Sequence, residues 1–212
     1  ALMSSVAWIY SHGNSDNSKN FEEINTKALT SKIFGTCGSI SIWIQEILKS
    51  QNIESRIVQT LTLDDWNTYD NGHTMIEIYR DDLKKWVLYD LDSNHYFSKN
   101  GIPLSLIEFV DAVKNNNYET HILASDTKLD VSNFLDENDF DYAFYTESVY
   151  ATKNTKENWY KRIIQIPMIG EGKFSYFTTN NVEERKQMES YASHHKFLSI
   201  DEFQSKFYGN LG

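Results

Sequence analysis

The stretch that decides the fold is residues 35–58, which read GTCGSISIWIQEILKSQNIESRIV. From Gly38 onward, apolar residues recur three and four positions apart, which is the period of one face of an α-helix. The residues of this face are Ile40, Trp43, Ile44, Ile47 and Leu48. Ile42 lies off the face and indicates a helix that is buried on more than one side. The stretch therefore predicts a buried helix with Cys37 at its N-terminus, followed by a β-strand over Arg56–Leu63.

Cys37 is the only cysteine in the sequence, so the chain can form no intramolecular disulfide. A lone cysteine is more often a small buried hydrophobic residue than a reactive one. At a helix N-terminus, however, the unpaired N–H groups and the helix dipole favour the thiolate, which is the nucleophilic form. Gly35 and Gly38 on either side would let a substrate approach the backbone. An N–H group at this helix end could also stabilise an oxyanion.

Residues 73–90, HTMIEIYRDDLKKWVLYD, predict two strands joined by a four-residue loop, Arg80–Leu83. This register puts His73 directly opposite Asp90, with Cβ atoms about 5 Å apart on one face of the sheet. At that distance the carboxylate can orient the imidazole and stabilise the imidazolium. A single histidine in a strand is more often structural, and the inference depends on the register. The alternative orienting residues on the same alternating face are Asp92 and Asn94.

The order of these elements, a helix with the cysteine and then strands with the histidine and the aspartate, predicts a compact α+β unit. Both segments resemble the transglutaminase-like superfamily, over roughly residues 30–95. The run around Cys37 is similar to the family's nucleophile helix and following strand, and residues 73–90 look like its His strand and its "Trp, Val, x, x, Asp" strand. The resemblance implies a papain-like fold with Cys37 as nucleophile, His73 as general base and acid, and Asp90 as the orienting residue. Members include protein crosslinkers, proteases and glycan-releasing amidases.

The chain departs from the family pattern at three places. Met75 stands where an aromatic residue often follows the histidine, and Leu91-Asp92 stands where Pro-Thr often follows the aspartate. Asn52 stands in the region where glycine commonly precedes the second strand. None of these differences removes a member of the predicted triad. In some relatives an aromatic residue upstream of the cysteine helps to form the oxyanion hole. The candidates in this chain are Trp8 and Tyr10.

The second half of the chain carries weaker signals. Helices are predicted over Leu104–Val113, over Asn181–Ala192 and from Ser199, where Glu202 gives the spacing of a capping box. A hairpin is predicted from the strands Trp159–Ile169 and Lys173–Thr178. A group of aromatic residues either lines a substrate cleft or, as is commoner, packs in a core. Its members are Phe134, Phe140, Tyr142, Phe144 and Tyr145.

These patterns predict an α+β protein with a transglutaminase-like catalytic core in residues 1–100. An α+β elaboration in residues 101–212 would pack on this core and shape the substrate cleft. A single domain is the alternative, because no linker composition marks a boundary near residue 100.

Composition limits the partners of the protein. The formal net charge is −10, which argues against nucleic acid and anionic membrane surfaces, since both attract an excess of Lys and Arg. No apolar run approaches the roughly 20 residues of a membrane span. The opening residues lack the basic region of a signal peptide. We therefore expect a cytoplasmic protein, although removal of an export signal is compatible with the sequence.

Three hypotheses for function remain open. The first is thiol-dependent acyl transfer or amide or ester hydrolysis, on a peptide, a protein or another amide-bearing substrate and without a cofactor. The second is a catalytically silent transglutaminase-like binding or scaffold domain, and the third is an enzyme that acts within a larger assembly. A zinc site is disfavoured, because the sequence lacks the short paired spacings of structural zinc ligands. The residues weighed for zinc are Cys37, His73, Asp90 and His95.

Overall fold

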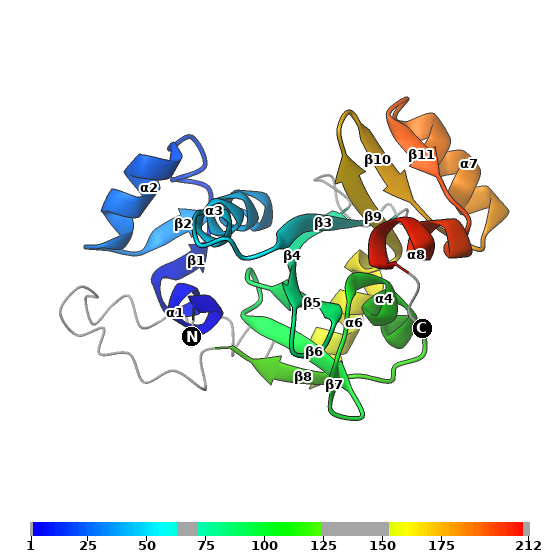
Figure 1. Ribbon diagram of the computed structural model, residues 1–212, viewed down its shortest axis with the longest axis horizontal. Helices are drawn as coiled ribbons and strands as arrows, with labels where there is room; N and C mark the ends of the chain where they lie inside the picture. Colours follow the sequence, from blue (N-terminus) through cyan, green and yellow to red (C-terminus); the bar gives the residue numbers. More distant parts are fainter. Residues whose placement is uncertain (1, 63–71, 124–152, 210–212) are drawn as a thin grey trace.

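The computed structural model describes residues 2–62, 72–123 and 153–209. A polar loop is expected from the sequence over Asp64–Gly72. Its residues 64–71 lie outside the described residues, while Gly72 begins β4. The aromatic group of residues 134–145 and the side chain of Trp8 also lie outside the described residues. The described residues form a mixed α+β structure. Figure 1 shows α1–α3 with β1 and β2 at one end of the molecule, and β9–β11 with α7 and α8 at the other.

One large sheet runs through the described part of the molecule. Its order is β11-β10-β9-β3-β4-β5-β6-β7, with β8 also pairing with β6. The bounds of its strands are β3 (Ser55–Leu61), β4 (Gly72–Arg80), β5 (Lys85–Asp90), β6 (His95–Lys99), β7 (Ile102–Pro103), β8 (Glu119–Ile122), β9 (Ile166–Glu171), β10 (Phe174–Phe177) and β11 (His195–Phe197). A separate parallel pair joins β1 (Tyr10–His12) to β2 (Ile33–Gly35). Because β9 pairs with β3, both halves of the chain share the large sheet, while the boundary near residue 100 stays a prediction.

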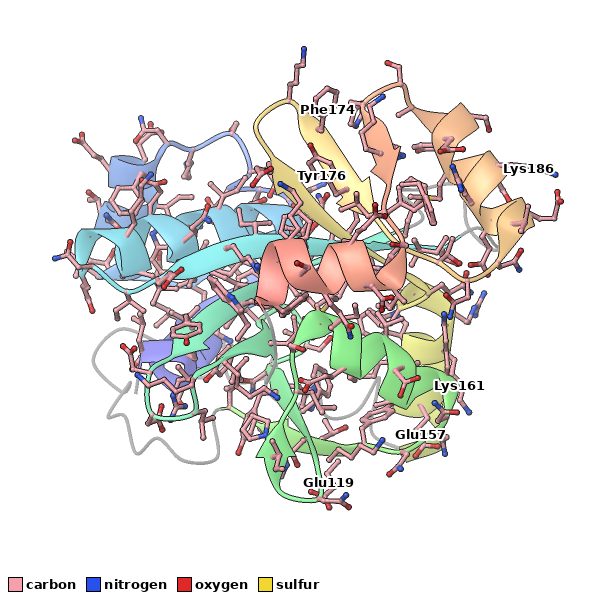
Figure 2. All side chains as sticks on the ribbon, turned by 45° about the vertical axis from the view of Figure 1, so that its right-hand side comes forward. Glu119, Glu157, Lys161, Phe174, Tyr176 and Lys186 are labelled. Carbon is pink, nitrogen blue, oxygen red and sulfur yellow. The ribbon has the colours of Figure 1, made fainter. Side chains whose placement is uncertain are left out.

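Helices cover both faces of this sheet. Their bounds are α1 (Leu2–Ile9), α2 (Phe21–Ala28), α3 (Cys37–Ser50), α4 (Leu106–Lys114), α6 (Lys153–Ile163), α7 (Val182–Tyr191) and α8 (Ile200–Tyr208). On one face α3 packs against Ile76 and Ile78 of β4. On the other face α4, α6 and α8 pack against Met75 of β4 and Leu88 of β5, and Figure 2 shows α8 beside α4. Among the described helices, none is long and apolar enough to cross a membrane.

Helix α3 begins where the sequence predicts it. Thr36 is the N-cap, its side chain accepts a hydrogen bond from the Ser39 backbone, and Ser39 returns the contact to complete a capping box. These contacts fix Cys37 as the first residue of the helix. After the helix, Asn52 has a φ of 57°, so it takes the left-handed conformation for which the family commonly has glycine.

The loop of the β4–β5 hairpin corrects the predicted register. Arg80 pairs with Lys85, so the loop is 81–84 and not Arg80–Leu83. The Leu83 amide closes a turn on the Arg80 carbonyl at 3.1 Å, and Lys84 follows with a φ of 53°. Four-residue hairpin loops are commonly built around such a turn, and here the left-handed residue delays the next strand by one position.

The corrected register keeps His73 and Asp90 on one face of the sheet. Extended beyond its last pair, it puts Asp92 opposite His73 and leaves Asp90 as the diagonal neighbour. Compared with the predicted register, β4 ends one residue later and β5 begins one residue later, so the pairing differs by two residues. Because side chains alternate between faces with a period of two, a difference of two residues leaves both side chains on the predicted face. A diagonal pair is still within reach of long side chains. The two side chains therefore meet, although they are not directly opposed as predicted.

In the second half, the hairpin prediction was wrong at its start. Residues 159–163 belong to α6, and the strand begins only at Ile166. Tyr160, Ile163 and Ile164 recur at helical spacing and are buried together in the core. The aromatic and β-branched residues resemble a strand locally, but their burial follows a helical period. The last helix was predicted correctly, because Ser199 caps α8 through Glu202.

Candidate active site

Cys37 is the first residue of α3, and it is half-buried. Its neighbour Gly38 has no heavy atom within 4 Å of the place where a Cβ would stand. The space predicted beside the cysteine is therefore open at Gly38. At Gly35 the side chains of Ser39 and Asn17 lie within 4 Å of the same point, so the expectation fails there. The first turn of a helix also has N–H groups that lack intrahelical partners. Together these features make the thiol accessible at the positive end of a helix.

His73 and Asp90 are both buried, and their side chains contact one another. His73 Nε2 lies 2.8 Å from Asp90 Oδ1, and the two side chains are 4% and 0% exposed. The Ser93 amide donates to the same Asp90 oxygen at 3.3 Å. Because Nε2 faces the carboxylate, the other ring nitrogen of His73, Nδ1, is the one available to the thiol. The alternative orienting residues have other positions: Asp92 contacts His12, and the side-chain oxygen of Asn94 is buried with no partner among the described residues.

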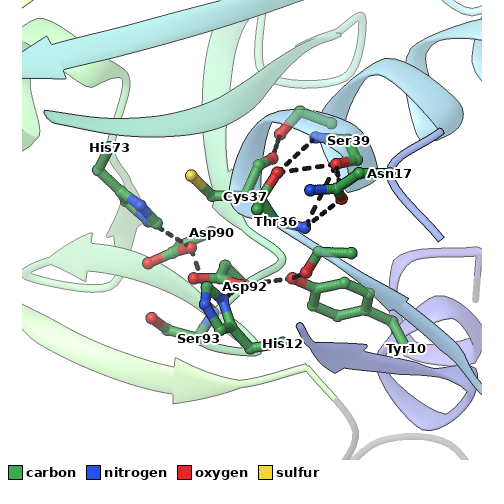
Figure 3. A network of polar contacts seen from close by, with 12 residues as sticks. Tyr10, His12, Asn17, Thr36, Cys37, Ser39, His73, Asp90, Asp92 and Ser93 are labelled. Atoms are coloured by element: carbon green, nitrogen blue, oxygen red, sulfur yellow. Dashed lines mark hydrogen bonds and ion pairs between the residues drawn. The ribbon is translucent and has the colours of Figure 1, made fainter. Parts of the chain in front are cut away.

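Cys37 and His73 lie close enough to change one another's ionisation, and Figure 3 shows the thiol directed toward the imidazole. Burial raises the pKa of Cys37. The hydrogen bond and the charge of His73 lower it by more than burial raises it, and the Thr74 amide also lowers it. The net result is a thiol pKa below its ordinary value. This is the shift expected for a cysteine beside an imidazolium.

The pKa of His73 moves in the opposite direction. Burial lowers it, but the charge and hydrogen bond of Asp90, together with the Cys37 thiolate, raise it well above the ordinary value. Burial likewise raises the pKa of Asp90, and the His73 imidazolium lowers it to a net value below normal. All three groups therefore favour their charged forms, and the structure brings together the three residues that the sequence singled out.

A glycine sets the position of His73. A Cβ on Gly72 would stand 2.5 Å from the Thr60 carbonyl oxygen, which belongs to the backbone of the neighbouring strand β3. Thr60 is also the residue that pairs with His73. Only glycine fits at this point without displacing the start of β4, so Gly72 fixes the approach of His73 to its partners.

Helix α6 completes the surroundings of the histidine and the aspartate. Trp159 packs edge-on against the His73 ring, with centroids 5.2 Å apart. The buried Tyr160 hydroxyl lies 3.1 Å from Asp90 Oδ2 and 3.3 Å from His95 Nδ1. Sequence reasoning missed both residues. The adjacent aromatic pair is their only local signal, and nothing in it points to residues some 70 positions earlier.

The upstream strand β1 contributes a second polar group. His12 Nδ1 lies 2.7 Å from Asp92 Oδ1, and Tyr10 also contacts that oxygen. The Tyr10 hydroxyl lies 2.8 Å from the Gly35 carbonyl oxygen, two residues before Cys37. Tyr10 was a candidate for the oxyanion hole, and its hydroxyl is engaged in these contacts. His12 was not singled out from the sequence.

Metal ligation has no support in the described part of the chain, where no group of three His, Cys, Asp or Glu side chains is arranged to hold a metal ion. His95, weighed as a zinc ligand, pairs with Asp90 across β5 and β6 and contacts Tyr160.

Comparison with known proteins identifies one family. Residues 1–91 match the family model of the transglutaminase-like superfamily, which confirms the resemblance over this segment. The match includes Cys37, His73 and Asp90 and covers less than half of the 212 residues. No curated protein and no solved structure matches the chain.

Proposed function

We propose that this protein catalyses thiol-dependent acyl transfer or amide or ester hydrolysis through an acyl-enzyme intermediate. Cys37 is the nucleophile, His73 is the general base and acid, and Asp90 orients His73. The observation that carries the proposal is the arrangement of the three side chains: Cys37 opens α3 with its thiol directed toward the His73 ring (Figure 3), and His73 Nε2 lies 2.8 Å from Asp90 Oδ1. In this arrangement the pKa of the Cys37 thiol is lowered and the pKa of the His73 imidazole is raised. Pairs of groups whose surroundings favour a thiolate and an imidazolium are typical of cysteine nucleophiles.

The reaction proceeds in two stages. The Cys37 thiolate attacks the carbonyl carbon, and the tetrahedral oxyanion is stabilised by N–H groups at the start of α3. The His73 imidazolium gives its proton to the leaving nitrogen or oxygen, the bond to that atom breaks, and a thioester forms on Cys37. An acceptor then attacks the thioester and releases the thiolate. Asp90 stays ionised throughout and stabilises the imidazolium.

We further propose that the substrate is a peptide, a protein or another amide-bearing molecule. The second half of the chain shapes the site through α6, because Trp159 contacts His73 and Tyr160 contacts Asp90. Residues beyond the segment that matches the superfamily therefore take part in positioning the proposed triad. This supports a role for residues 101–212 in forming the cleft.

Acylation of the protein by p-nitrophenyl acetate tests the proposal. We expect release of p-nitrophenolate and an acetyl group that peptide mass spectrometry locates on Cys37. Cys37→Ala should abolish this labelling, and His73→Ala should slow it by about 10²-fold or more. A wild-type protein that stays unlabelled, or that is labelled equally well in Cys37→Ala, would favour the catalytically silent binding domain.

A further inference from the structure

A second histidine–aspartate pair stands at the same site. His12 and Asp92 are joined by a 2.7 Å contact between Nδ1 and Oδ1. Asp92 follows Asp90 by two residues, so the end of β5 supplies the carboxylate for His73 and the turn after it supplies the carboxylate for His12. Figure 3 draws the Cys37 thiol with both pairs around it. The first pair serves the nucleophile in the proposed mechanism, and the second has no assigned role.

Electrostatic coupling ties the second pair to the thiol. The hydrogen bond to Asp92 is the main effect that raises the pKa of His12; burial lowers this pKa, and the charges of Asp92 and Cys37 raise it further. The His73 charge opposes these effects, and the net pKa lies above the ordinary value. The charge of Asp92 in turn raises the pKa of Cys37. The His12–Asp92 pair and the Cys37 thiol therefore influence one another's ionisation.

The two histidines differ in their access to solvent. The side chain of His12 is 56% exposed, whereas that of His73 is 4% exposed and lies under Trp159. Asp92 holds His12 through Nδ1, and Nε2 of His12 has no hydrogen-bond partner among the residues that the structure describes. Nε2 is therefore the atom that can meet a molecule arriving from solvent.

We propose that His12, in place of His73, is the general base that activates water for release of the acyl group, and that Asp92 orients it. His73 keeps the proton transfer of acylation and takes the last proton of the acid product. This inference rests on the proposed function and assigns the acceptor in its second stage. Water is the acceptor because the His12 imidazole is exposed to bulk solvent. A transferase would instead need to keep water away from its thioester.

The water oxygen attacks the thioester carbon while His12 Nε2 takes one water proton. The tetrahedral oxyanion collapses, the C–S bond breaks, and the sulfur leaves as the Cys37 thiolate. The acid product gives its remaining proton to the neutral His73, which restores the thiolate–imidazolium pair. The proton on His12 passes to solvent, so one ester or amide has been hydrolysed with no other reactant.

The decay of an isolated acyl-enzyme tests this role directly. Wild type, His12→Gln and the control His121→Gln are acetylated with p-nitrophenyl acetate in amine-free buffer and desalted. Loss of the acetyl mass is then followed by intact-protein mass spectrometry. His121 is a partly exposed histidine on β8 that stacks on Tyr96, and it makes no contact with the site residues described above.

We expect His12→Gln to lose the acetyl group about 10²-fold more slowly than wild type, which is the usual contribution of a general base. Its acetylation should slow far less, because His12 acts on that stage only through the charge it places near the Cys37 thiol. His121→Gln should behave as wild type in both stages. Equal decay in His12→Gln and wild type would overturn the role of His12. A wild-type acyl-enzyme that persists until an amine is added would overturn water as the acceptor. Failure of the proposed function itself shows earlier, as absence of acetylation on Cys37.

Discussion

Three separate parts of the chain meet at the imidazole of His73. Cys37 comes from the start of α3, Asp90 from the end of β5, and Trp159 from α6. Each contact changes the ionisation or the orientation of the ring, and the ring is almost fully buried. A buried charge is stable only when it is paired and hydrogen-bonded, so the imidazolium depends on Asp90 and the thiolate depends on the imidazolium.

The pH dependence of acylation follows from these shifts. The reactive ion pair needs a deprotonated Cys37, whose pKa is lowered, and a protonated His73, whose pKa is raised. The acylation rate should therefore rise as the pH climbs through the lowered thiol value and fall as it climbs through the raised imidazole value. The apparent pKa values belong to the coupled pair. Stopped-flow release of p-nitrophenolate across the pH range measures both limbs.

Asp90→Asn should narrow this pH window from both sides. Without the carboxylate, the pKa of His73 falls, and a less charged imidazole no longer lowers the pKa of Cys37. The maximal rate should drop by roughly 10²–10⁴-fold, as in other triads that lose the orienting carboxylate. A variant that stays folded by circular dichroism and keeps the wild-type profile would show that Asp90 does not govern the pair.

Tyr160 should contribute mainly to stability. Tyr160→Phe removes the hydroxyl that lies 3.1 Å from Asp90 Oδ2 and leaves a buried carboxylate oxygen with one donor fewer. We expect a loss of about 1–3 kcal/mol in the free energy of unfolding, measured by urea denaturation. Tyr118→Phe is the matched control, because Tyr118 packs edge-on against the Tyr160 ring and makes no hydrogen bond to Asp90 among the described residues. Equal effects of the two variants would contradict the contact with Asp90.

At this scale the sequence carried clear signals for some residues and none for others. Cys37 was predictable because it is the only cysteine in the sequence and precedes an amphipathic run. His73 and Asp90 were predictable because His73 begins one strand pattern and Asp90 ends the next, which brings them together in a hairpin. His12 and Tyr160 were missed. Their contacts join positions that are 80 and 70 residues apart, and no local pattern encodes such a pairing.

Among the elements, β4 determines how the site is assembled. Its first residue, Gly72, lies against the Thr60 backbone, and its second residue is His73. The same strand carries Ile76 toward α3 and Met75 toward α4 and α6, so it is packed on both faces. A strand held in this way has little freedom to adjust, and a shift at its start would be passed on to the histidine.

Gly72→Ala tests this arrangement. The added Cβ would meet the Thr60 carbonyl oxygen at 2.5 Å, a contact that only backbone movement can relieve. We expect a loss of about 1–3 kcal/mol in unfolding free energy, together with slower acylation as His73 is displaced. Gly170→Ala in β9 is the control, since its added Cβ would have no atom within 4 Å. Wild-type stability and acylation in Gly72→Ala would rule out the proposed constraint.

Elements with strong periodicity were predicted closely, and the hairpin register was not. The apolar face of residues 40–48 gave the start of α3, whereas the cap at Thr36 is a finding of the structure. Ile42, which was expected to be buried on a second side of the helix, is 58% exposed. The β4–β5 register depends on the left-handed backbone of Lys84, which the residue type does not signal, because lysine seldom adopts it. The predicted contact between His73 and Asp90 still forms, because a register difference of two residues leaves both side chains on the same face of the sheet.

For the molecule as a whole, one buried ion pair ties the end of the chain to the sheet. Glu77 is 0% exposed and accepts hydrogen bonds from the Leu106 amide at 2.6 Å and the Tyr208 hydroxyl at 3.1 Å. Arg56 lies 2.7 Å from Glu77, donates to the Phe207 carbonyl oxygen at 2.5 Å and stacks on aromatic rings. The pair therefore joins β3 and β4 to the start of α4 and the end of α8.

Arg56→Met should lower the free energy of unfolding, because Glu77 stays buried without its partner. The change leaves the Glu77 carboxylate without its cation, and breaking a buried pair in this way costs about 3–5 kcal/mol. The loss should shrink as the pH is lowered, because burial already raises the pKa of Glu77 and the protonated form needs no cation. Arg80→Met breaks a surface pair with Asp82 and should cost about 1 kcal/mol or less. Similar urea denaturation curves for the two variants would contradict the account.

The arrangement of the whole molecule was the least predictable part. The mixed α+β class followed from the alternation of helix and strand patterns. The pairing of β9 with β3 and the packing of α6 on the site did not follow from it, because the first joins segments about 100 residues apart and the second joins residues 70 positions apart. The match to the superfamily ends at residue 91 and so offers no guide to them.

The most direct test of the central claim is the pH dependence of Cys37 alkylation by iodoacetamide, in wild type and in His73→Ala. The sequence contains one thiol, so the reaction reports on Cys37 alone. We predict that wild-type labelling stays fast well below the ordinary thiol pKa of about 8.5, and that His73→Ala moves the midpoint to higher pH. Slow labelling that rises only near the ordinary pKa, with no effect of His73→Ala, would contradict a thiolate–imidazolium pair at this site.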